Sequence, residues 1–369
     1  AAERMEEVAA NTRDLLHFFQ AAYKWEETPG DVLGFRKCGK FRMVYHPPKP
    51  KSVRWGEHIV SQYPEMESKV AGFDWPLFGA QAEETSLRLQ AARWLKRAEL
   101  AEKPTATQRR LVIDRVVKAY EPCKTNAPHI ISSGSLLWNG FLKDFKEAIN
   151  SLELDSGISL PYELLNKDVH RQMVEDPKFL PLLTRLTWNC LQKMSHVDFR
   201  EMTPEQLVRE GLCDPIRLFV KGEPHKHAKL DEGRYRIIMS VSAVDQPIVR
   251  VLFQAQNKKE IALWRGLPSK PGFGLSTDRE AREFIESLSK TVGCSPEEVI
   301  PRRRDKIVPT DCSGFITSVA EWMLEDDMEV RNLHTINNNE LTRRLRAKWL
   351  KGITNSVICT SDGVLYAQT

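Results

Sequence analysis

The chain has 369 residues, 41% of them hydrophobic, and its 54 Lys and Arg against 50 Asp and Glu leave a net charge of only +4. This length and composition can bury the core of one large or two ordinary domains and exclude a disordered chain, while the weak charge does not by itself separate a nucleic-acid binder from an ordinary enzyme. Seven scattered cysteines without a CxxC pair argue against a disulfide framework or zinc site, and an acidic start without a long apolar run predicts neither a signal peptide nor a transmembrane segment.

The first half of the chain is predicted to be mostly helical. Residues 31–55 mix aromatic, basic and proline residues, which predicts short strands and loops. Between Thr85 and Leu100, apolar residues recur at helical spacing with arginines between them, which predicts a helix with one buried and one basic face, either solvated or in contact with RNA. Further helices are predicted at 104–120, 136–152, 177–194 and 204–210.

The second half begins with a predicted strand, loop, strand unit. Residues 217–220 and 235–241 are apolar and β-branched, and a charged loop lies between them. The elements that follow are a helix at 246–264, a glycine loop at 269–278, a helix at 279–290, a strand in 307–315, a helix with apolar positions between 319 and 330, and a final hairpin at 356–368. Asp362 and Gly363 between two apolar runs are a strong hairpin signal.

The charged loop is the first candidate site. Lys221, Lys229, Arg234 and Arg236 lie in or beside it. Arginine binds phosphate through two parallel hydrogen bonds and lysine offers a mobile charge, so a mixed basic loop held by two strands suits a triphosphate. A solvated surface loop fits the same residues, because the interleaved acids, such as Glu223, can neutralise part of the charge.

The second candidate is Asp311, at the end of the predicted strand in 307–315 and followed by the flexible CSG sequence. A carboxylate at a strand end can bind a hard divalent cation such as Mg²⁺, although a turn or helix cap is the more common use of a single aspartate. The glycine loop KPGFGL around Gly272 matches no phosphate-binding fingerprint and is predicted to be a structural turn. His225 and His227 are interpreted as loop residues rather than a metal pair.

In this order, the basic loop and Asp311 resemble a positive-strand RNA virus polymerase. The loop is similar to motif F of the fingers, with the opening Lys221 and Glu223, then Lys229, and the basic residues Arg234 and Arg236 after a glycine. VPTDCSGF is similar to palm motif A, in which the aspartate holds the catalytic metals. More narrowly, stretches such as LFVKGEPHKHAKLDEGRYRII and PSKPGFGLSTD resemble the sobemovirus replicase over residues 72–369.

The resemblance implies an α+β right-hand polymerase with helix-rich fingers and the start of an antiparallel palm sheet. It divides the chain into an N-terminal extension with fingers (1–103), fingers with the basic loop (104–300) and the beginning of the palm (301–369). The implied activity is RNA-directed RNA synthesis in viral genome replication, as part of a polyprotein. Mg²⁺ or Mn²⁺ is the implied cofactor. The implied partners are template and product RNA, nucleoside triphosphates, a genome-linked viral protein and other replicase proteins in replication complexes of the host cytoplasm.

Two departures from the family pattern qualify these expectations. Ile316 stands where motif A has a second aspartate that senses the ribose 2′-hydroxyl, and an apolar side chain cannot accept that hydrogen bond. The sequence also contains no later glycine and serine loop or paired aspartates of palm motifs B and C. We therefore expect these 369 residues alone to be inactive, and the alternative function is that of a catalytically incomplete RNA- or partner-binding replicase fragment.

Overall fold

The computed structural model describes residues 2–28, 34–42, 55–315 and 318–369. Two compact units are each built from segments that are separated in sequence. The main unit comprises residues 1–102, 129–252 and 344–369, and the second unit comprises residues 103–128 and 253–343. Among the described residues, no helix is both long and apolar enough to span a bilayer.

A six-stranded sheet forms the centre of the main unit. Its strands, in spatial order, are β1 (Tyr23–Trp25), β2 (Phe35–Phe41), β12 (Val364–Gln368), β11 (Val357–Cys359), β7 (Ile216–Val220) and β9 (Ile237–Ser240). Neighbours pair antiparallel except β11 and β7, which are parallel, so the sheet is mixed and not purely antiparallel as expected. The predicted strand, loop, strand unit and the final hairpin are confirmed as β7 with β9 and β11 with β12.

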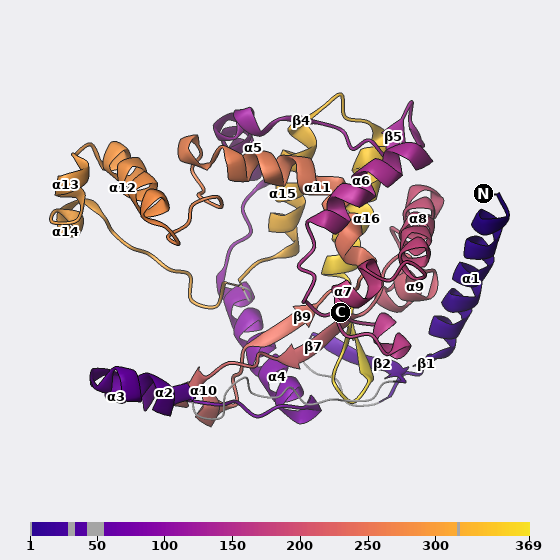
Figure 1. Cartoon of the computed structure of the whole chain (residues 1–369), viewed down its shortest axis with the longest axis horizontal. Coiled ribbons are helices and arrows are strands. Elements are labelled where there is room, and N and C mark those ends of the chain that lie inside the picture. The colour runs from indigo at the N-terminus through magenta and orange to yellow at the C-terminus, as the bar shows by residue number, and fades with distance from the viewer. Residues whose placement is uncertain (1, 29–33, 43–54, 316–317) are drawn as a thin grey trace. The chain divides into compact units, whose positions relative to one another are not determined.

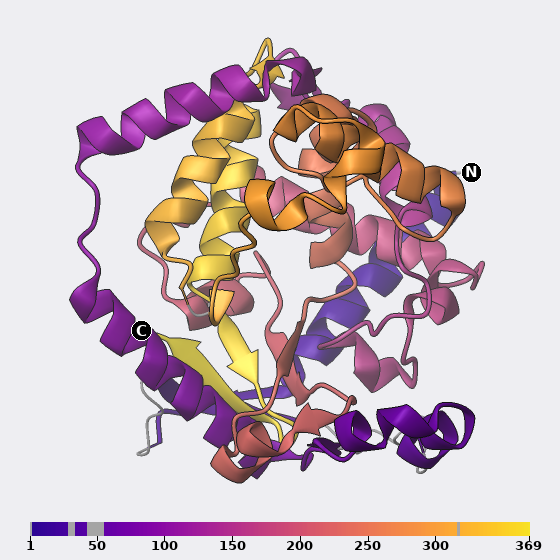
Figure 2. The same cartoon turned by 90° about the vertical axis from the view of Figure 1, so that its left-hand side faces the viewer.

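Side chains alternate across β7 and place the core on one face of the sheet. Ile216, Leu218 and Val220 are buried, whereas Arg217 and Phe219 between them are only partly buried. The long helix α4 (Ala80–Leu100) covers the buried face, and its Leu87 joins the cluster that contains Ile216, Leu218, Ile358 and Tyr366. Figure 2 shows the first part of α4 running along the strands β11 and β12. The predicted helix at 85–100 is thus confirmed, with its first turns earlier in the chain.

The turn between β11 and β12 is fixed by a buried carboxylate of α4. Glu83, only 1% exposed, accepts hydrogen bonds from the Ser361 backbone N–H at 2.8 Å and from the Ser361 hydroxyl at 2.5 Å. Asp362 closes the turn by accepting from the Thr360 hydroxyl, and Gly363 takes a left-handed φ of 84°. The local turn residues and the long-range contact with Glu83 therefore stabilise the same hairpin turn.

Helices complete the main unit (Figure 1). They are α1 (Ala2–Ala21), α2 (Trp55–Gln62), α3 (Glu67–Val70), α6 (Trp138–Asn150), α7 (His170–Val174), α8 (Leu180–His196), α9 (Pro204–Arg209) and α10 (His227–Glu232). The predicted helices at 136–152, 177–194 and 204–210 are confirmed by α6, α8 and α9. Trp138 of α6 packs edge-on against Trp188 of α8, with ring centroids 5.1 Å apart. Two-residue strands pair as β3 (Phe73–Asp74) with β8 (His225–Lys226) and β5 (Ile131–Ser132) with β6 (Ser135–Leu136).

The second unit is mostly helical. It contains α5 (Ala106–Ala119), α12 (Asp278–Val292), α13 (Pro296–Val299), α14 (Arg303–Lys306), α15 (Glu321–Leu333) and the short parallel pair β4 (Thr125–Asn126) and β10 (Thr335–Ile336). Two further helices, α11 (Asp245–Ala262) and α16 (Glu340–Thr354), contribute residues to both units. Arg109 of α5 contacts Asp326 of α15 at 2.7 Å, so that carboxylate belongs to an ion pair between helices rather than to a purely solvated face.

The fold confirms the predicted α+β class, together with the helices at 104–120, 246–264, 279–290 and after 319. The helices α1 and α16 are additional to those predicted. The division at residues 103 and 300 into fingers and palm stays a prediction. One break between the compact units falls between residues 102 and 103, whereas none falls near residue 300. A single sheet joins β2, the β7 and β9 pair and the final hairpin, which lie in all three predicted segments.

Candidate functional site: the basic loop of the β7–β9 hairpin

The basic loop, residues 221–236, connects β7 to β9 and is internally ordered. It contains the strand β8 and the helix α10, which ends at Gly233 in a left-handed conformation with φ 73°. The backbone N–H of Lys221 donates to the carbonyl of Arg236 at 2.8 Å, which closes the loop at its neck. Pairing of β8 with β3 and packing of the buried Tyr235 against Ala82 and Val220 hold the loop against the rest of the main unit.

His225 organises the interior of this loop. It is 3% exposed, its Nδ1 lies 2.7 Å from the Glu223 carbonyl oxygen, and its Nε2 lies 2.9 Å from the Arg236 backbone nitrogen. A carbonyl can only accept and a backbone N–H can only donate, so this geometry selects the neutral tautomer with its proton on Nδ1. Burial lowers the pKa of His225, which agrees with a neutral ring. The prediction that the histidines are loop residues rather than metal ligands fits this arrangement, and His227 Nε2 donates to the Ala71 carbonyl.

The four predicted phosphate-binding cations lie on this loop, but only two of them converge. Glu223 accepts from Lys221 Nζ at 3.0 Å and from Arg236 Nη1 at 2.6 Å, so one carboxylate joins two cations. Burial opposes ionisation of Glu223, but the two cations outweigh that effect and lower its pKa. Arg234 pairs separately with Glu232 at 2.8 Å, and Lys229 lies half-buried on α10. The expectation that the interleaved acids neutralise part of the charge therefore describes the loop correctly.

A cleft opens on the face of β7 that is turned away from the core. It has a volume of about 1240 Å³, and its lining includes Lys221 and, from β7, Arg217 and Phe219. Arg217 Nη1 contacts Glu163 at 2.6 Å, and the guanidinium lies 5.5 Å from the centre of the Phe219 ring. The exposed side chain of Arg236 lies on the same loop as Lys221. We did not predict Arg217 and Glu163 as site residues, although the alternation in IRLFV already assigns Arg217 to the face opposite Leu218.

Asp311 occupies a different setting from the one expected. Residues 307–312 have no strand partners, so the predicted strand is wrong, and Asp311 is exposed on an extended segment that follows α14. Among the described residues, no group of three or more His, Cys, Asp or Glu side chains is arranged to hold a metal ion. Asp311 is thus a single candidate ligand, and the described side chains do not assemble a metal site around it. Ile316 lies outside the described residues.

The KPGFGL loop is a structural turn, as predicted. Lys270 Nζ donates to the carbonyls of Trp264 and Leu267 and so caps the end of a helical turn. A side chain at Gly272 would meet the Ile261 carbonyl oxygen at 2.1 Å, which explains the glycine there. The one cation of this loop, Lys270, is therefore engaged by the protein's own backbone.

Sequence similarity to known proteins places the chain in a family. The family model described as "Viral RNA-directed RNA-polymerase" matches residues 56–369. Protein P1-P2 of Turnip yellows virus is 56% identical over 353 residues, which cover 95% of this chain and 34% of that protein. Protein P1-P2 of Potato leafroll virus is 57% identical over 95% of this chain and 33% of that protein. Replicase polyprotein P2AB of Southern cowpea mosaic virus is 33% identical over 94% of this chain and 34% of that protein.

The resemblance to sobemovirus replicases thus holds at the level of the family, and the P1-P2 proteins share more of the sequence. The chain spans about a third of the length of the curated relatives that it matches. The match from residue 56 to residue 369 includes both the β7–β9 hairpin and Asp311. The chain belongs to the viral RNA-directed RNA polymerase family.

Proposed function

We propose that the chain is part of an RNA-directed RNA polymerase that replicates the genome of a positive-strand RNA virus, and that its basic loop binds the incoming nucleoside triphosphate. The observation that supports this proposal is the contact of Glu223 with both Lys221 and Arg236 at the neck of the loop. A carboxylate held between two cations is in the position that a phosphate oxygen would take, because both anions accept charged hydrogen bonds from the same donors.

A polymerase must bind each triphosphate and release pyrophosphate, so moderate affinity suits its nucleotide site. Displacement of Glu223 by the triphosphate would keep the affinity moderate, because the cations lose their ion pairs with Glu223 when they bind phosphate. Arg236 is 58% exposed at its side chain and Lys221 37%, so both can exchange partners without unfolding the loop. Lys229 and Arg234 would add long-range attraction for the polyanion.

Asp311 would supply one oxygen ligand to a divalent cation, for which we propose Mg²⁺ or Mn²⁺, the hard cations that carboxylates prefer. Its exposed position leaves it accessible to such an ion. The chemistry that the ion supplies in this family of reactions is stabilisation of charge on the transferring phosphate. The remaining partners that we propose are template and product RNA, a genome-linked viral protein and other replicase proteins in replication complexes of the host cytoplasm, in either a P1-P2 or a sobemovirus P2AB type of polyprotein.

The nucleotide site is tested by calorimetric titration of the 369-residue chain with ATP. Replacement of Arg236 by Ala removes one charged donor and should weaken binding by roughly 10- to 150-fold, the equivalent of about 1.5 to 3 kcal/mol for a charged hydrogen bond. Arg13→Ala on the exposed surface of α1 removes the same charge from the main unit and serves as the control. Equal affinities of the Arg236→Ala and Arg13→Ala proteins would refute the proposed triphosphate site.

A further inference from the structure

Three residues join the two strands of the β7–β9 hairpin at its base, the end opposite the basic loop. Asp214 precedes β7, and Ser242 and Asp245 follow β9. The Ser242 hydroxyl donates to Asp214 Oδ2 at 2.6 Å, the Asp214 backbone N–H donates to Asp245 Oδ2 at 2.9 Å, and the Asp245 backbone N–H donates to Ser242 Oγ at 3.1 Å. These bonds form a closed ring that ties the start of β7 to the start of α11.

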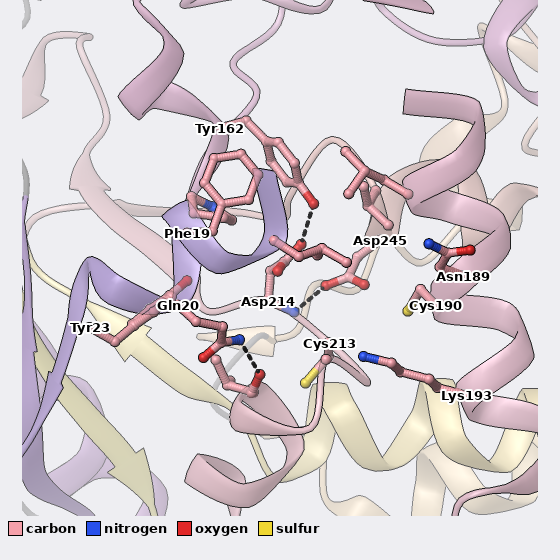
Figure 3. Close-up of a pocket in the computed structure, with 16 residues that line it drawn as sticks. Phe19, Gln20, Tyr23, Tyr162, Asn189, Cys190, Lys193, Cys213, Asp214 and Asp245 are labelled. Carbon is pink, nitrogen blue, oxygen red and sulfur yellow. Dashed lines mark hydrogen bonds between the residues drawn. The ribbon is translucent and has the colours of Figure 1, made fainter. Parts of the chain in front are cut away.

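The ring is largely buried in the main unit. Ser242 is fully buried and Asp245 is 8% exposed, whereas Asp214 is partly buried. The Tyr162 hydroxyl donates a further hydrogen bond to Asp214 Oδ2 at 3.2 Å. Figure 3 shows Tyr162 and Asp245 turned toward Asp214. All three residues line a cavity of about 40 Å³. Two carboxyl groups thus share a small, poorly solvated space.

The electrostatics of this space disfavour simultaneous ionisation of the two carboxyl groups. Burial, with the neighbouring Asp245, raises the pKa of Asp214 to about 8. Burial also raises the pKa of Asp245, although the Lys348 ammonium, 2% exposed on α16, partly opposes it. The buried Lys348 ammonium compensates one carboxylate, and burial disfavours the second negative charge.

The other titratable groups around the pair come from several elements. They are Tyr23 of β1, Tyr162, Cys190 and Lys193 of α8, Cys213, and Lys348 of α16. Burial raises the pKa of both tyrosines well above its ordinary value, raises that of Cys190 to about 12 and raises that of Cys213. The phenols and thiols therefore stay neutral between about pH 7 and pH 9, where the carboxyl pair gains its second charge.

The strand β9, which follows the basic loop, is the edge strand of the described sheet. Its only strand partner in the described sheet is β7, over residues 237–240, and Arg236 comes directly before it. We propose that Asp214 and Asp245 are positioning residues, whose hydrogen-bonded ring with Ser242 fixes the base of this hairpin and thereby the spacing of Lys221 and Arg236. The inference rests on the proposed triphosphate site, because that site gives the spacing its function.

The experiment measures ATP affinity of the 369-residue chain between about pH 7 and pH 9. Charge repulsion between the two ionised carboxylates should push apart the ends of β7 and β9 at the base of the hairpin. ATP binding of the wild-type protein should therefore weaken by about fivefold or more as the pH rises. Asp214→Asn keeps an oxygen acceptor for Ser242 and Tyr162 but carries no charge, so this variant should retain its affinity at pH 9. Asp14 is an exposed aspartate on α1, and Asp14→Asn is the control. The ATP affinity of this variant should fall with rising pH as that of the wild type does.

The outcomes separate this inference from the proposed function. A wild-type ATP affinity that is constant from pH 7 to pH 9, while Arg236→Ala still weakens binding, would overturn the positioning role and leave the triphosphate site intact. A parallel loss of affinity in Asp214→Asn and wild type would also overturn it. If the Asp214→Asn protein does not fold, the wild-type pH profile alone decides the matter. A chain that binds no ATP at any pH would overturn the proposed function itself.

Discussion

Replacement of His225 by Ala is expected to loosen the basic loop. The change removes the donor to the Glu223 carbonyl and the acceptor for the Arg236 N–H, at 2.7 and 2.9 Å. A hydrogen bond contributes about 0.5 to 1.5 kcal/mol and an unsatisfied buried group costs about 1 to 3 kcal/mol, so the loop should lose roughly 2 to 4 kcal/mol of local stability. His225→Gln, whose amide can both donate and accept, should recover part of this loss.

Hydrogen exchange of the Arg236 amide measures the effect directly. A loss of about 2 kcal/mol in local opening free energy corresponds to roughly 30-fold faster exchange of this amide in His225→Ala than in the wild type. His17→Ala, an exposed histidine of α1, should leave the amide's protection unchanged and serves as the control. Unchanged protection in His225→Ala would refute the interpretation of His225 as the centre of the loop.

The hydrogen bond from the Arg236 N–H to His225 Nε2 predicts that the stability of the loop falls in acid. Burial lowers the pKa of His225 in the folded protein below the ordinary value of about 6.5. Its contribution to stability is therefore fully present above about pH 6.5 and is lost as the pH falls through the depressed folded value, because a protonated Nε2 can no longer accept from Arg236. Protection of the Arg236 amide, corrected for intrinsic exchange, should fall in this acid range in the wild type and not in His225→Gln.

Three further predictions follow from other contacts. Glu83→Ala should destabilise the protein toward urea by about 2 to 4 kcal/mol, since it leaves both the Ser361 N–H and hydroxyl unpaired, and a loss below about 0.5 kcal/mol would contradict the structure. Glu223→Gln should tighten ATP binding about two- to fivefold by weakening the internal competitor of the triphosphate, and weaker binding would show that Glu223 positions the cations instead. In the longer polymerase, Asp311→Asn should abolish nucleotide incorporation in a primer-extension assay while RNA binding in a filter assay persists, and an active variant would remove Asp311 from the metal site.

The strongest sequence predictions concern local chemistry. The hairpin of β11 and β12 follows from two apolar runs around Asp362 and Gly363, because a glycine can take the left-handed conformation that such a turn requires. The helix predicted at 279–290 is likewise confirmed as α12, and the structure shows that Thr277 and Glu280 form a capping box at its start. The position of the basic loop between two strands is equally local, since each strand carries its own apolar pattern.

Predictions failed where a segment depends on distant partners. Residues 307–310 are apolar enough for a strand, but a strand exists only where a neighbour supplies hydrogen bonds, and none is formed there. The helix α16 was not predicted. In the structure Lys348 and Arg346 of α16 are buried, and Arg346 donates to the Leu252 carbonyl. Burial of a charge is decided by its partners and not by its own residue type.

The sequence alone therefore sufficed for the polymerase family, the α+β class and the position of the basic loop between two strands, because contiguous patterns indicate each of them. Only the tertiary structure showed that Glu223 holds Lys221 and Arg236 together and that Asp214 and Asp245 close the base of the same hairpin. The physical reason is the range of the interactions. Propensities and turns act over a few residues, whereas the protonation of a buried carboxyl group depends on charges such as Lys348, which the fold brings next to it from more than a hundred residues away.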